Sequence, residues 1–460
     1  MGPNQQAFCA SRLAAVLGCL VMVLLSPGMA KAQTTVVVFE GARLIVGDGS
    51  APINNGAMVV RDGRIAAIGR KGSIQAPAGA ARVDLTDKTV MPTLVNVHVH
   101  IGYEGYTSWS AQNYTSQNVL DHLEREAFYG VGATQTVGSS PTDASIRFVQ
   151  DQEAGRFPSA SRFFFMPGMA PPNGGPDAIL IKGTSALQAV YEISTPEQAR
   201  AAVQSMATKK LKSVKIWVDD RRGTYPKMPP EVYSAIIDEA HKHQMMVNAH
   251  ATTLADQKAV VRAGIDVLVH IVANEKLDDE YLVLLREKKP YWTPVMGLGD
   301  RSDVCDNDPF FTQTLPPRTV SEIREKECSQ PAATIGAREK FIANNFPKMI
   351  DAGVRLVLGT DAGITPRYSF GWAEHHEIAR YVQLGLTPSQ AVVAATQRPA
   401  ELLGIRDLGT LAVGKSADFI VLDASPLDDI RNTRQIAGVY LHGKKLDRDA
   451  LLAEWKKLGN

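Results

Sequence analysis

Eight short apolar runs that alternate with amphipathic segments constrain the fold of this chain more than any other feature. The runs are residues 94–99, 133–137, 162–166, 214–218, 245–249, 266–271, 291–296 and 355–358. Apolar strands separated by helices are typical of βα units, in which a parallel sheet is buried on both faces. Eight such units within about 300 residues predict an α/β fold, a closed (β/α)8 TIM barrel. A doubly wound open sheet is the alternative, but no G-x-G-x-x-G motif follows an early strand.

Four of the segments between these runs carry clear helix signals. They are residues 195–208, 230–242, 254–263 and 278–288. Thr195 can cap the first helix, with Pro196 at the first helical position, and Asp278 can cap the last. The segments therefore supply helices that cover the barrel.

Both ends of the chain show a β-strand pattern outside the barrel. Short strand-like runs fill residues 33–89, where Asn55-Gly56 and Asp62-Gly63 suit tight hairpin turns. The same pattern returns in residues 405–446. We therefore expect a small β-sandwich domain formed from both chain ends, a barrel domain over 90–404 and a C-terminal helix over 447–460.

The first 32 residues have the pattern of a secretory signal peptide. Arg12 precedes an apolar run over residues 13–25, and a small-residue motif ends at Ala32. This run is too short to span a bilayer, which takes about 20 residues. The pattern predicts cleavage after Ala32, a secreted or periplasmic mature protein and no stable membrane insertion. An N-terminal membrane anchor is the alternative.

Cleavage would leave two of the four cysteines, Cys305 and Cys328. In an oxidising compartment we expect these two residues to form a disulfide. The bridge would close a polar loop that follows the seventh strand and lies at the rim formed by the carboxyl ends of the strands. Two unrelated thiols are the alternative.

The charges of the chain are nearly balanced. Lys and Arg total 49 against 48 Asp and Glu, a formal net charge of +1. No overall field therefore attracts nucleic acid. The sequence leaves a homo-oligomer open.

Titratable side chains gather at the carboxyl ends of the predicted strands, where barrel enzymes place their active sites. They are His98 and His100 on the first strand, Lys215 on the fourth, His250 and His270 on the fifth and sixth, and Asp361 after the eighth. Residues two apart on a strand share a face, so His98 and His100 can bind one ion. Imidazole and carboxylate ligands favour zinc without excluding iron, nickel or manganese.

Lys215 is the exception in this set, because an ammonium group is repelled by divalent cations. Either the side chain stays outside the metal ligands, or it has reacted with carbon dioxide to form a carbamate. The carbamate is an anion that can bridge two metal ions. The residues alone leave both accounts open.

Eight sequence stretches match one known family. They are residues 92–100, 214–216, 247–250, 268–270, 358–363, 375–378, 385–388 and 408–422. On these stretches the chain resembles the metal-dependent amidohydrolase superfamily, in its imidazolonepropionase-like and Xaa-Pro dipeptidase-like branch. The match extends over essentially the whole mature chain.

The resemblance implies a centre with two divalent metal ions, for which zinc is favoured. One ion would take His98, His100 and Asp361, and the other would take His250 and His270. N-carboxylated Lys215 would bridge them. Catalytic Asp361 would move a proton from the hydroxide nucleophile to the leaving group.

The implied reaction is hydrolysis of a C–N bond in a small-molecule substrate, which would be an amide, peptide, carbamate or cyclic amide. The same binuclear site could instead hydrolyse an ester, lactone or phosphoester. A non-catalytic binding barrel is the remote alternative.

Three positions depart from the family pattern. Thr93 and Asn96 stand where Gly and Asp are usual, and Thr252 stands where peptidase-like members often carry an aromatic residue or His. Asn96 keeps a hydrogen-bonding oxygen but loses a charge. These departures weaken any transfer of dipeptide specificity.

Three residues are candidates for substrate binding. They are Tyr103 after the first strand, Arg221 after the fourth and His375 near the last barrel helix. Arg221 could hold a carboxylate, and a solvated charged turn is the alternative. We expect the adjacent His376 to lie on the surface.

Overall fold

The computed structural model describes residues 36–106, 108–175, 189–297, 305, 308–328, 333–365 and 367–457. The expected signal peptide lies outside these residues. Within the described part of the chain, no helix is long and apolar enough to cross a membrane.

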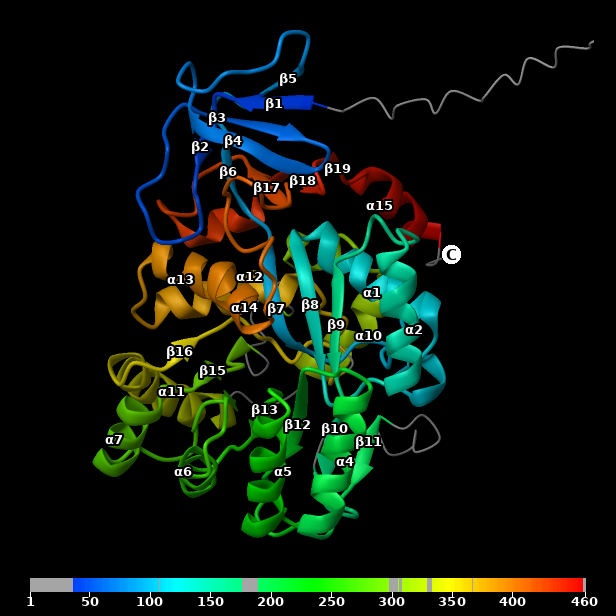
Figure 1. The fold of residues 1–460 in the computed structure, drawn as a ribbon, viewed down its shortest axis with the longest axis vertical. Coiled ribbons are helices and arrows are strands. Elements are labelled where there is room, and N and C mark those ends of the chain that lie inside the picture. The colour runs from blue at the N-terminus through cyan, green and yellow to red at the C-terminus, as the bar shows by residue number, and fades with distance from the viewer. Residues whose placement is uncertain are drawn as a thin grey trace, which may run out of the picture. The chain divides into compact units, whose positions relative to one another are not determined.

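Parallel strands lie at each of the eight predicted positions (Figure 1). In chain order they are β7 (Leu94–Val99), β8 (Val131–Val137), β9 (Arg162–Met166), β12 (Ser213–Trp217), β13 (Met246–His250), β14 (Val267–Val269), β15 (Tyr291–Thr293) and β16 (Arg355–Leu356). Strands β7, β8 and β9 pair in that order, and β12 to β16 pair in chain order.

The two groups of strands join into a ring at both of their edges. β10 (Gly168–Ala170) follows β9 and pairs with β12 on one side and with β11 (Val190–Glu192) on the other. At the opposite edge, the amide of Val97 donates to the carbonyl of Leu358 at 3.0 Å, which connects β7 to the end of β16. The predicted barrel is therefore present, with its wall completed by β10.

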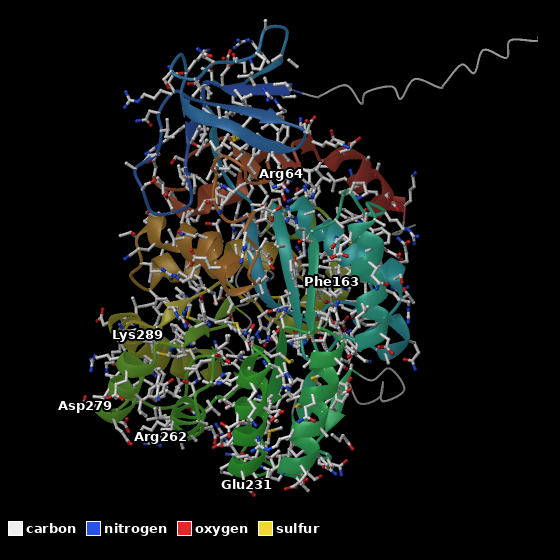
Figure 2. All side chains as sticks on the ribbon, in the orientation of Figure 1. Arg64, Phe163, Glu231, Arg262, Asp279 and Lys289 are labelled. Carbon is white, nitrogen blue, oxygen red and sulfur yellow. A yellow bond between two sulfur atoms is a disulfide. The ribbon has the colours of Figure 1, made fainter. Side chains whose placement is uncertain are left out.

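Helices follow the barrel strands along the chain. They are α1 (Ser116–Phe128), α2 (Thr142–Glu153), α4 (Pro196–Thr208), α5 (Pro230–Lys242), α6 (Leu254–Arg262), α7 (Asp279–Lys288), α9 (Pro309–Thr312), α10 (Pro317–Cys328), α11 (Ala333–Asp351) and α12 (Trp372–Gln383). The predicted caps are in place, because Thr195 accepts from the amide of Gln198 and Asp278 from the amide of Tyr281. Glu231 in the first turn of α5 and Arg262 in the last turn of α6 (Figure 2) complement the dipoles of their helices.

Strands from both chain ends form two further sheets. Their members are β1 (Val36–Glu40), β2 (Arg43–Leu44), β3 (Gly56–Arg61), β4 (Arg64–Arg70), β5 (Ala81–Asp84), β6 (Thr89–Pro92), β17 (Phe419–Leu422), β18 (Ile436–Leu441) and β19 (Lys444–Lys445). The first sheet has the order β4-β3-β1-β5, and the second has the order β19-β18-β17-β6-β2. Phe39 of the first sheet packs edge-on against Phe419 of the second, with ring centroids 5.0 Å apart. The hairpin turn between β3 and β4 has positive φ at Asp62 and Gly63, as the Asp-Gly pair predicts.

The chain returns from the barrel to these sheets through α13 (Pro388–Ala395) and α14 (Gln397–Leu402). It ends in α15 (Arg448–Lys457), which lies within the predicted 447–460 segment. Trp455 of α15 donates to Asp121 of α1 at 2.8 Å, and the Arg125 guanidinium lies 4.2 Å from the centre of the Trp455 ring. Through such contacts the sheets, α15 and the barrel form one compact unit.

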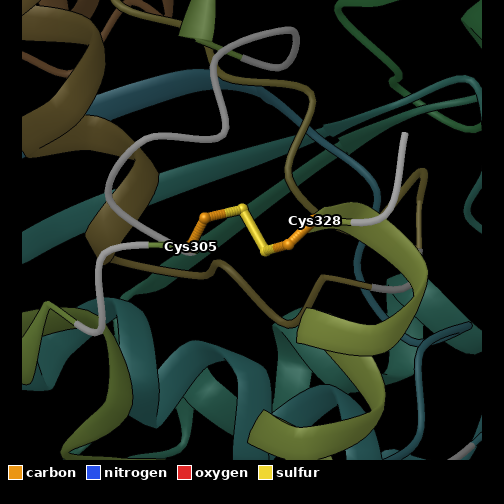
Figure 3. The surroundings of a disulfide bond; sticks show 2 residues. All are labelled: Cys305 and Cys328. Carbon is orange, nitrogen blue, oxygen red and sulfur yellow. A yellow bond between two sulfur atoms is a disulfide. The ribbon is translucent and has the colours of Figure 1, made fainter. Parts of the chain in front are cut away.

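Cys305 and Cys328 form a disulfide (Figure 3). Cys328 ends α10. Residues of that helix, including Thr319 and Ile323, line one small cavity together with Glu104 and residues next to it. Because Glu104 lies in the loop that follows β7, the bridged segment lies at the same end of the barrel as His98 and His100.

Candidate metal centre

One cluster of ligand atoms joins the first and last barrel strands. His98 and His100 lie on and directly after β7, and Asp361 follows β16. The Nε2 atoms of His98 and His100 lie 3.0 and 2.9 Å from Oδ1 of Asp361. All three side chains are buried, and their ligand atoms lie within 4.8 Å of one another. This group could hold one metal ion.

A second cluster lies on the neighbouring strands. His250 ends β13, and His270 directly follows β14. Nδ1 of His250 and Nε2 of His270 lie 2.8 Å apart, so one lone pair from each ring can meet at a single point. The rings of His270 and His98 have centroids 6.1 Å apart. The two clusters therefore belong to one site.

Lys215 lies on β12, the strand next to β13, which carries His250. Its side chain is fully buried on β12, and Nζ lies 5.8 Å from the centre of the Trp217 ring. Burial is the main cause that lowers the pKa of both His98 and His270, and the positive charge of Lys215 adds to it. The structure thus brings together all six residues that the sequence predicted as ligands.

The protonation states of these groups suit a metal ion. Burial, with the charge of Lys215, lowers the pKa of His98 to about 4. Burial and the adjacent His250 hold the pKa of His270 well below its usual value. Burial opposes ionisation of Asp361, yet His98 and His100 hold its pKa well below the usual range. Neutral imidazoles and an ionised carboxylate are the forms that bind metals.

A buried ring nitrogen also points to a missing partner. Nδ1 of His98 has no hydrogen-bond partner among the described residues, although the side chain is only 1% exposed. Nε2 of the same ring also has no hydrogen-bond partner among the described residues, and it lies 3.0 Å from Oδ1 of Asp361. A buried polar atom without a partner is costly. The residues of the site therefore fit a bound cation.

The backbone holds two of the candidate ligand residues in an uncommon conformation. His270 has φ 76° and Asp361 has φ 62°, both in the left-handed region that non-glycine residues rarely adopt. Such conformations persist where the surrounding structure imposes them, and they cluster at functional sites. Gly359 allows the chain after β16 to approach β7 closely. A Cβ at this position would lie only 2.7 Å from Cβ of His98, too close for a non-bonded contact.

Asn96, which stands in place of the usual Asp, has a structural explanation. Its Nδ2 donates to Thr360 Oγ1 at 3.0 Å and also to Glu374 on α12, while its Oδ1 accepts from the amide of His98 at 2.9 Å. Glu374 and Glu126 on α1 are both fully buried. An aspartate at position 96 could not donate and would add a third carboxyl to this buried pair. The amide therefore suits this site.

The Glu126–Glu374 pair makes stability depend on pH. Burial, with repulsion from Glu374, raises the pKa of Glu126 well above its ordinary value of 4.5. Such a group contributes stability below pH 4.5, and this contribution is lost as the pH rises toward its folded-state pKa. We expect Glu126→Gln to stabilise the protein by about 1 to 2 kcal/mol at pH 7 and to change little at pH 4.

Thermal unfolding at several pH values measures this effect. The exposed Glu153→Gln on α2 is the matched control and should leave the pH profile unchanged. Equal profiles for Glu126→Gln and wild type would contradict the prediction.

The residues expected to bind substrate lie in different environments. Tyr103 is fully buried, stacks on Trp109 and donates to the carbonyl of Ser139. Arg221 has a side chain that is 51% exposed, with Nε 3.5 Å from Asp219. His375 is buried, and its Nε2 donates to the carbonyl of Tyr129 at 2.8 Å. Only Arg221 is placed where an incoming molecule can reach it directly.

The expectation that His376 lies on the surface is wrong. The residue is 6% exposed, and its ring stacks on Trp372 with centroids 5.0 Å apart. Helix α12 is buried over most of its circumference, and the sequence pattern alone did not reveal this.

Sequence reasoning missed Asp219 as part of the site. Nε2 of His250 donates to Oδ2 of Asp219 at 2.9 Å, and the Asp219 side chain is only 4% exposed. A signal was available, because Asp219 directly follows a strand whose Lys215 was already a candidate. The charged run 219–222 instead suggested a solvated turn.

A cavity of about 980 Å³ lies away from this cluster. Residues at the amino ends of β9, β12 and β13 line it, among them Arg162, Ser213 and Met246. None of the six predicted ligand residues belongs to its lining. The candidate site is therefore the cluster of titratable side chains at the carboxyl ends of the strands.

Comparisons with known proteins address the family and the fold of the chain. The sequence model of the amidohydrolase family matches residues 89–446. The chain is 25% identical to ochratoxinase from Aspergillus niger over 457 residues, which cover 90% of this chain and 87% of the relative. It is 40% identical to imidazolonepropionase from Deinococcus deserti over 87 residues, which cover 19% and 21% of the two chains. The solved structure of a Xaa-Pro dipeptidase with bound methionine shares the fold, with a TM-score of 0.70, 24% identity and coverage of 89% and 99%.

Proposed function

This chain belongs to the amidohydrolase family, and we propose on that basis that it uses divalent metal ions to hydrolyse a small organic substrate. As a family member it is a hydrolase that acts on C–N bonds. The bond cleaved would be that of an amide, peptide, carbamate or cyclic amide. The convergence of His98, His100 and Asp361 with His250 and His270 supports the proposal most directly.

The proposed ligand set divides into two groups. His98, His100 and Asp361 would hold one ion, and His250 and His270 would hold a second. Lys215, N-carboxylated, would lie between them and replace a repulsive ammonium by an anion. When bound, such ions polarise a carbonyl and lower the pKa of water toward neutrality, and zinc is the ion favoured by this donor set.

Asp361 would carry the proton transfers. The structure keeps this carboxylate ionised between two imidazoles, so it can accept a proton from water at Oδ1 or Oδ2. It can then deliver the proton to the leaving nitrogen, whose departure as an amine requires protonation. Ser139 Oγ lies 3.0 Å from Nδ1 of His100 and keeps that ring in position.

Metal analysis and a substrate panel test this function. We expect about two divalent ions per wild-type chain, and His98→Ala should lose metal together with hydrolysis. The panel should contain N-acyl amino acids, Xaa-Pro dipeptides, aryl carbamates, lactams and lactones. Hydrolysis of lactones without any C–N substrate would refute the proposed bond type. Bicarbonate dependence of metal loading tests carboxylation of Lys215.

Arg221 would bind a carboxylate on the substrate. Its guanidinium is half exposed and follows β12 at the carboxyl end of the barrel. We expect Arg221→Ala to raise KM about 10-fold for substrates that carry a carboxylate, because a charge-assisted hydrogen bond is lost. KM for neutral amides should not change. Arg222→Ala is the matched control, and equal effects on both substrate classes would contradict this role.

The domain and export assignments remain part of the proposal. The two terminal sheets would form a small β-sandwich domain beside the barrel domain of residues 90–404, and the mature protein would be secreted or periplasmic. The Cys305–Cys328 bridge is consistent with an oxidising compartment. Mass spectrometry of the exported protein should find Gln33 at its amino terminus, and an intact leader would refute cleavage after Ala32.

A further inference from the structure

We propose that Asp219 is a positioning residue that orients His250 toward the metal position. Its carboxylate accepts the Nε2 proton of His250 and thereby directs the Nδ1 lone pair toward the metal position. This inference rests on the proposed function, because it assigns a role within the same metal centre.

The contacts of His250 distinguish its two ring nitrogens. Nε2 lies 2.9 Å from Oδ2 of Asp219, and Nδ1 lies 2.8 Å from Nε2 of His270. A carboxylate can only accept, so the proton of a neutral His250 ring belongs on Nε2. Nδ1 is then the nitrogen that converges with His270. A carboxylate hydrogen-bonded to a metal-binding histidine fixes both its tautomer and its ring orientation.

The surroundings of Asp219 hold this carboxylate in place. The amide of Arg221 donates to Oδ1 at 2.8 Å, and Thr252 Oγ1 lies 3.2 Å from Oδ2. The side chain is 4% exposed and lies two residues after the end of β12, which also carries Lys215. Asp219 is therefore rigidly held and is not a freely solvated residue of a charged turn.

The same contacts explain why a threonine stands at position 252. At this position, where an aromatic residue or His is frequent in peptidase-like members, the hydroxyl donates to the carboxylate that orients His250. Thr252 thus supports the metal centre through Asp219. We assign it no contact with substrate.

The first test reads the tautomer in the protein itself. In the zinc-loaded mature chain with ¹⁵N-labelled histidine, long-range ¹H–¹⁵N spectra at pH 8 should show the His250 proton on Nε2. His250→Gln identifies the signal. A proton on Nδ1 of His250 would overturn the proposal, whatever the variants do.

The second test measures zinc affinity by competition with a chromogenic chelator. Asp219→Asn should weaken the affinity for one zinc ion by about 10- to 100-fold, the usual effect of removing such a partner. Its amide can donate to Nε2 and so favours the wrong tautomer. Thr252→Val should weaken zinc binding by a smaller factor, and Thr252→Ser should match wild type.

Matched controls separate positioning from a general loss of structure. Asp220→Asn changes the adjacent carboxyl, which lies 3.5 Å from Lys227, and it should bind zinc like wild type. Equal zinc affinity for Asp219→Asn and Asp220→Asn would overturn the role of Asp219. If Asp219→Asn does not fold, the Thr252 pair and the wild-type tautomer still decide the question.

Failure of this inference differs from failure of the proposed function. If His250→Gln loses zinc and Asp219→Asn does not, only the positioning role of Asp219 is refuted. If His250→Gln binds zinc and hydrolyses substrate like wild type, the metal centre itself is wrongly assigned.

Discussion

Replacing Asp361 by Asn is expected to lower kcat/KM by about 10³-fold, because the variant loses the group that accepts and returns the proton. The carboxamide has nearly the same shape but cannot take up a proton at neutral pH. Asp361 is buried and held by His98 and His100, so water cannot replace its function from bulk solvent. Steady-state kinetics on a C–N substrate from the panel measure the loss.

Two further measurements separate the acid–base role of Asp361 from a role as a metal ligand and from a nonspecific loss of activity. Metal content of Asp361→Asn shows whether the carboxylate also acts as a ligand, since an amide binds cations more weakly than a carboxylate. Asp351→Asn, an exposed residue at the end of α11, should keep full activity. Full activity in Asp361→Asn would refute its acid–base role.

Removal of the Cys305–Cys328 disulfide is expected to have the second large effect. Replacing both cysteines by Ser should lower the free energy of unfolding by about 3 kcal/mol, because a loop of 23 residues is no longer closed in the unfolded chain. Chemical denaturation monitored by fluorescence measures the change. The bridged α10 also lies against the loop after β7, so KM should change more than metal content.

Each single Cys→Ser variant should be as unstable as the double variant, because either substitution opens the loop. Reduction of the wild-type protein should reproduce the change in KM. Two free thiols in the denatured, unreduced mature protein would disprove the bridge. Unchanged kinetics after reduction would contradict its influence on the substrate site.

The strands and the positions of the candidate ligand residues could be predicted because they depend on local patterns. The period of two in β7 places His98 and His100 on one face, and parallel strands bring their carboxyl ends to one rim. His250, His270 and Asp361 then meet these residues wherever the chain closes into a barrel. The Thr195 and Asp278 caps are equally local, since each binds an amide within the next few residues.

Contacts between elements far apart in sequence could not be read from such patterns. The Glu126–Glu374 pair depends on how α1 and α12 meet, and the burial of His375 and His376 depends on what covers α12. The bond between Asp219 and His250 depends on the turn after β12, where Arg221 takes a left-handed conformation.

The sequence by itself determined the barrel, the six residues at its rim and the cysteines available for a bridge, because strand periodicity and chain order decide which side chains share an end. Only the tertiary structure decided which ring nitrogen of His250 faces Asp219 and which faces His270. It also decided why Asn96 suits its position and where the bridged segment lies. These features depend on side-chain directions and on packing between distant elements, and a linear pattern of residues does not specify either.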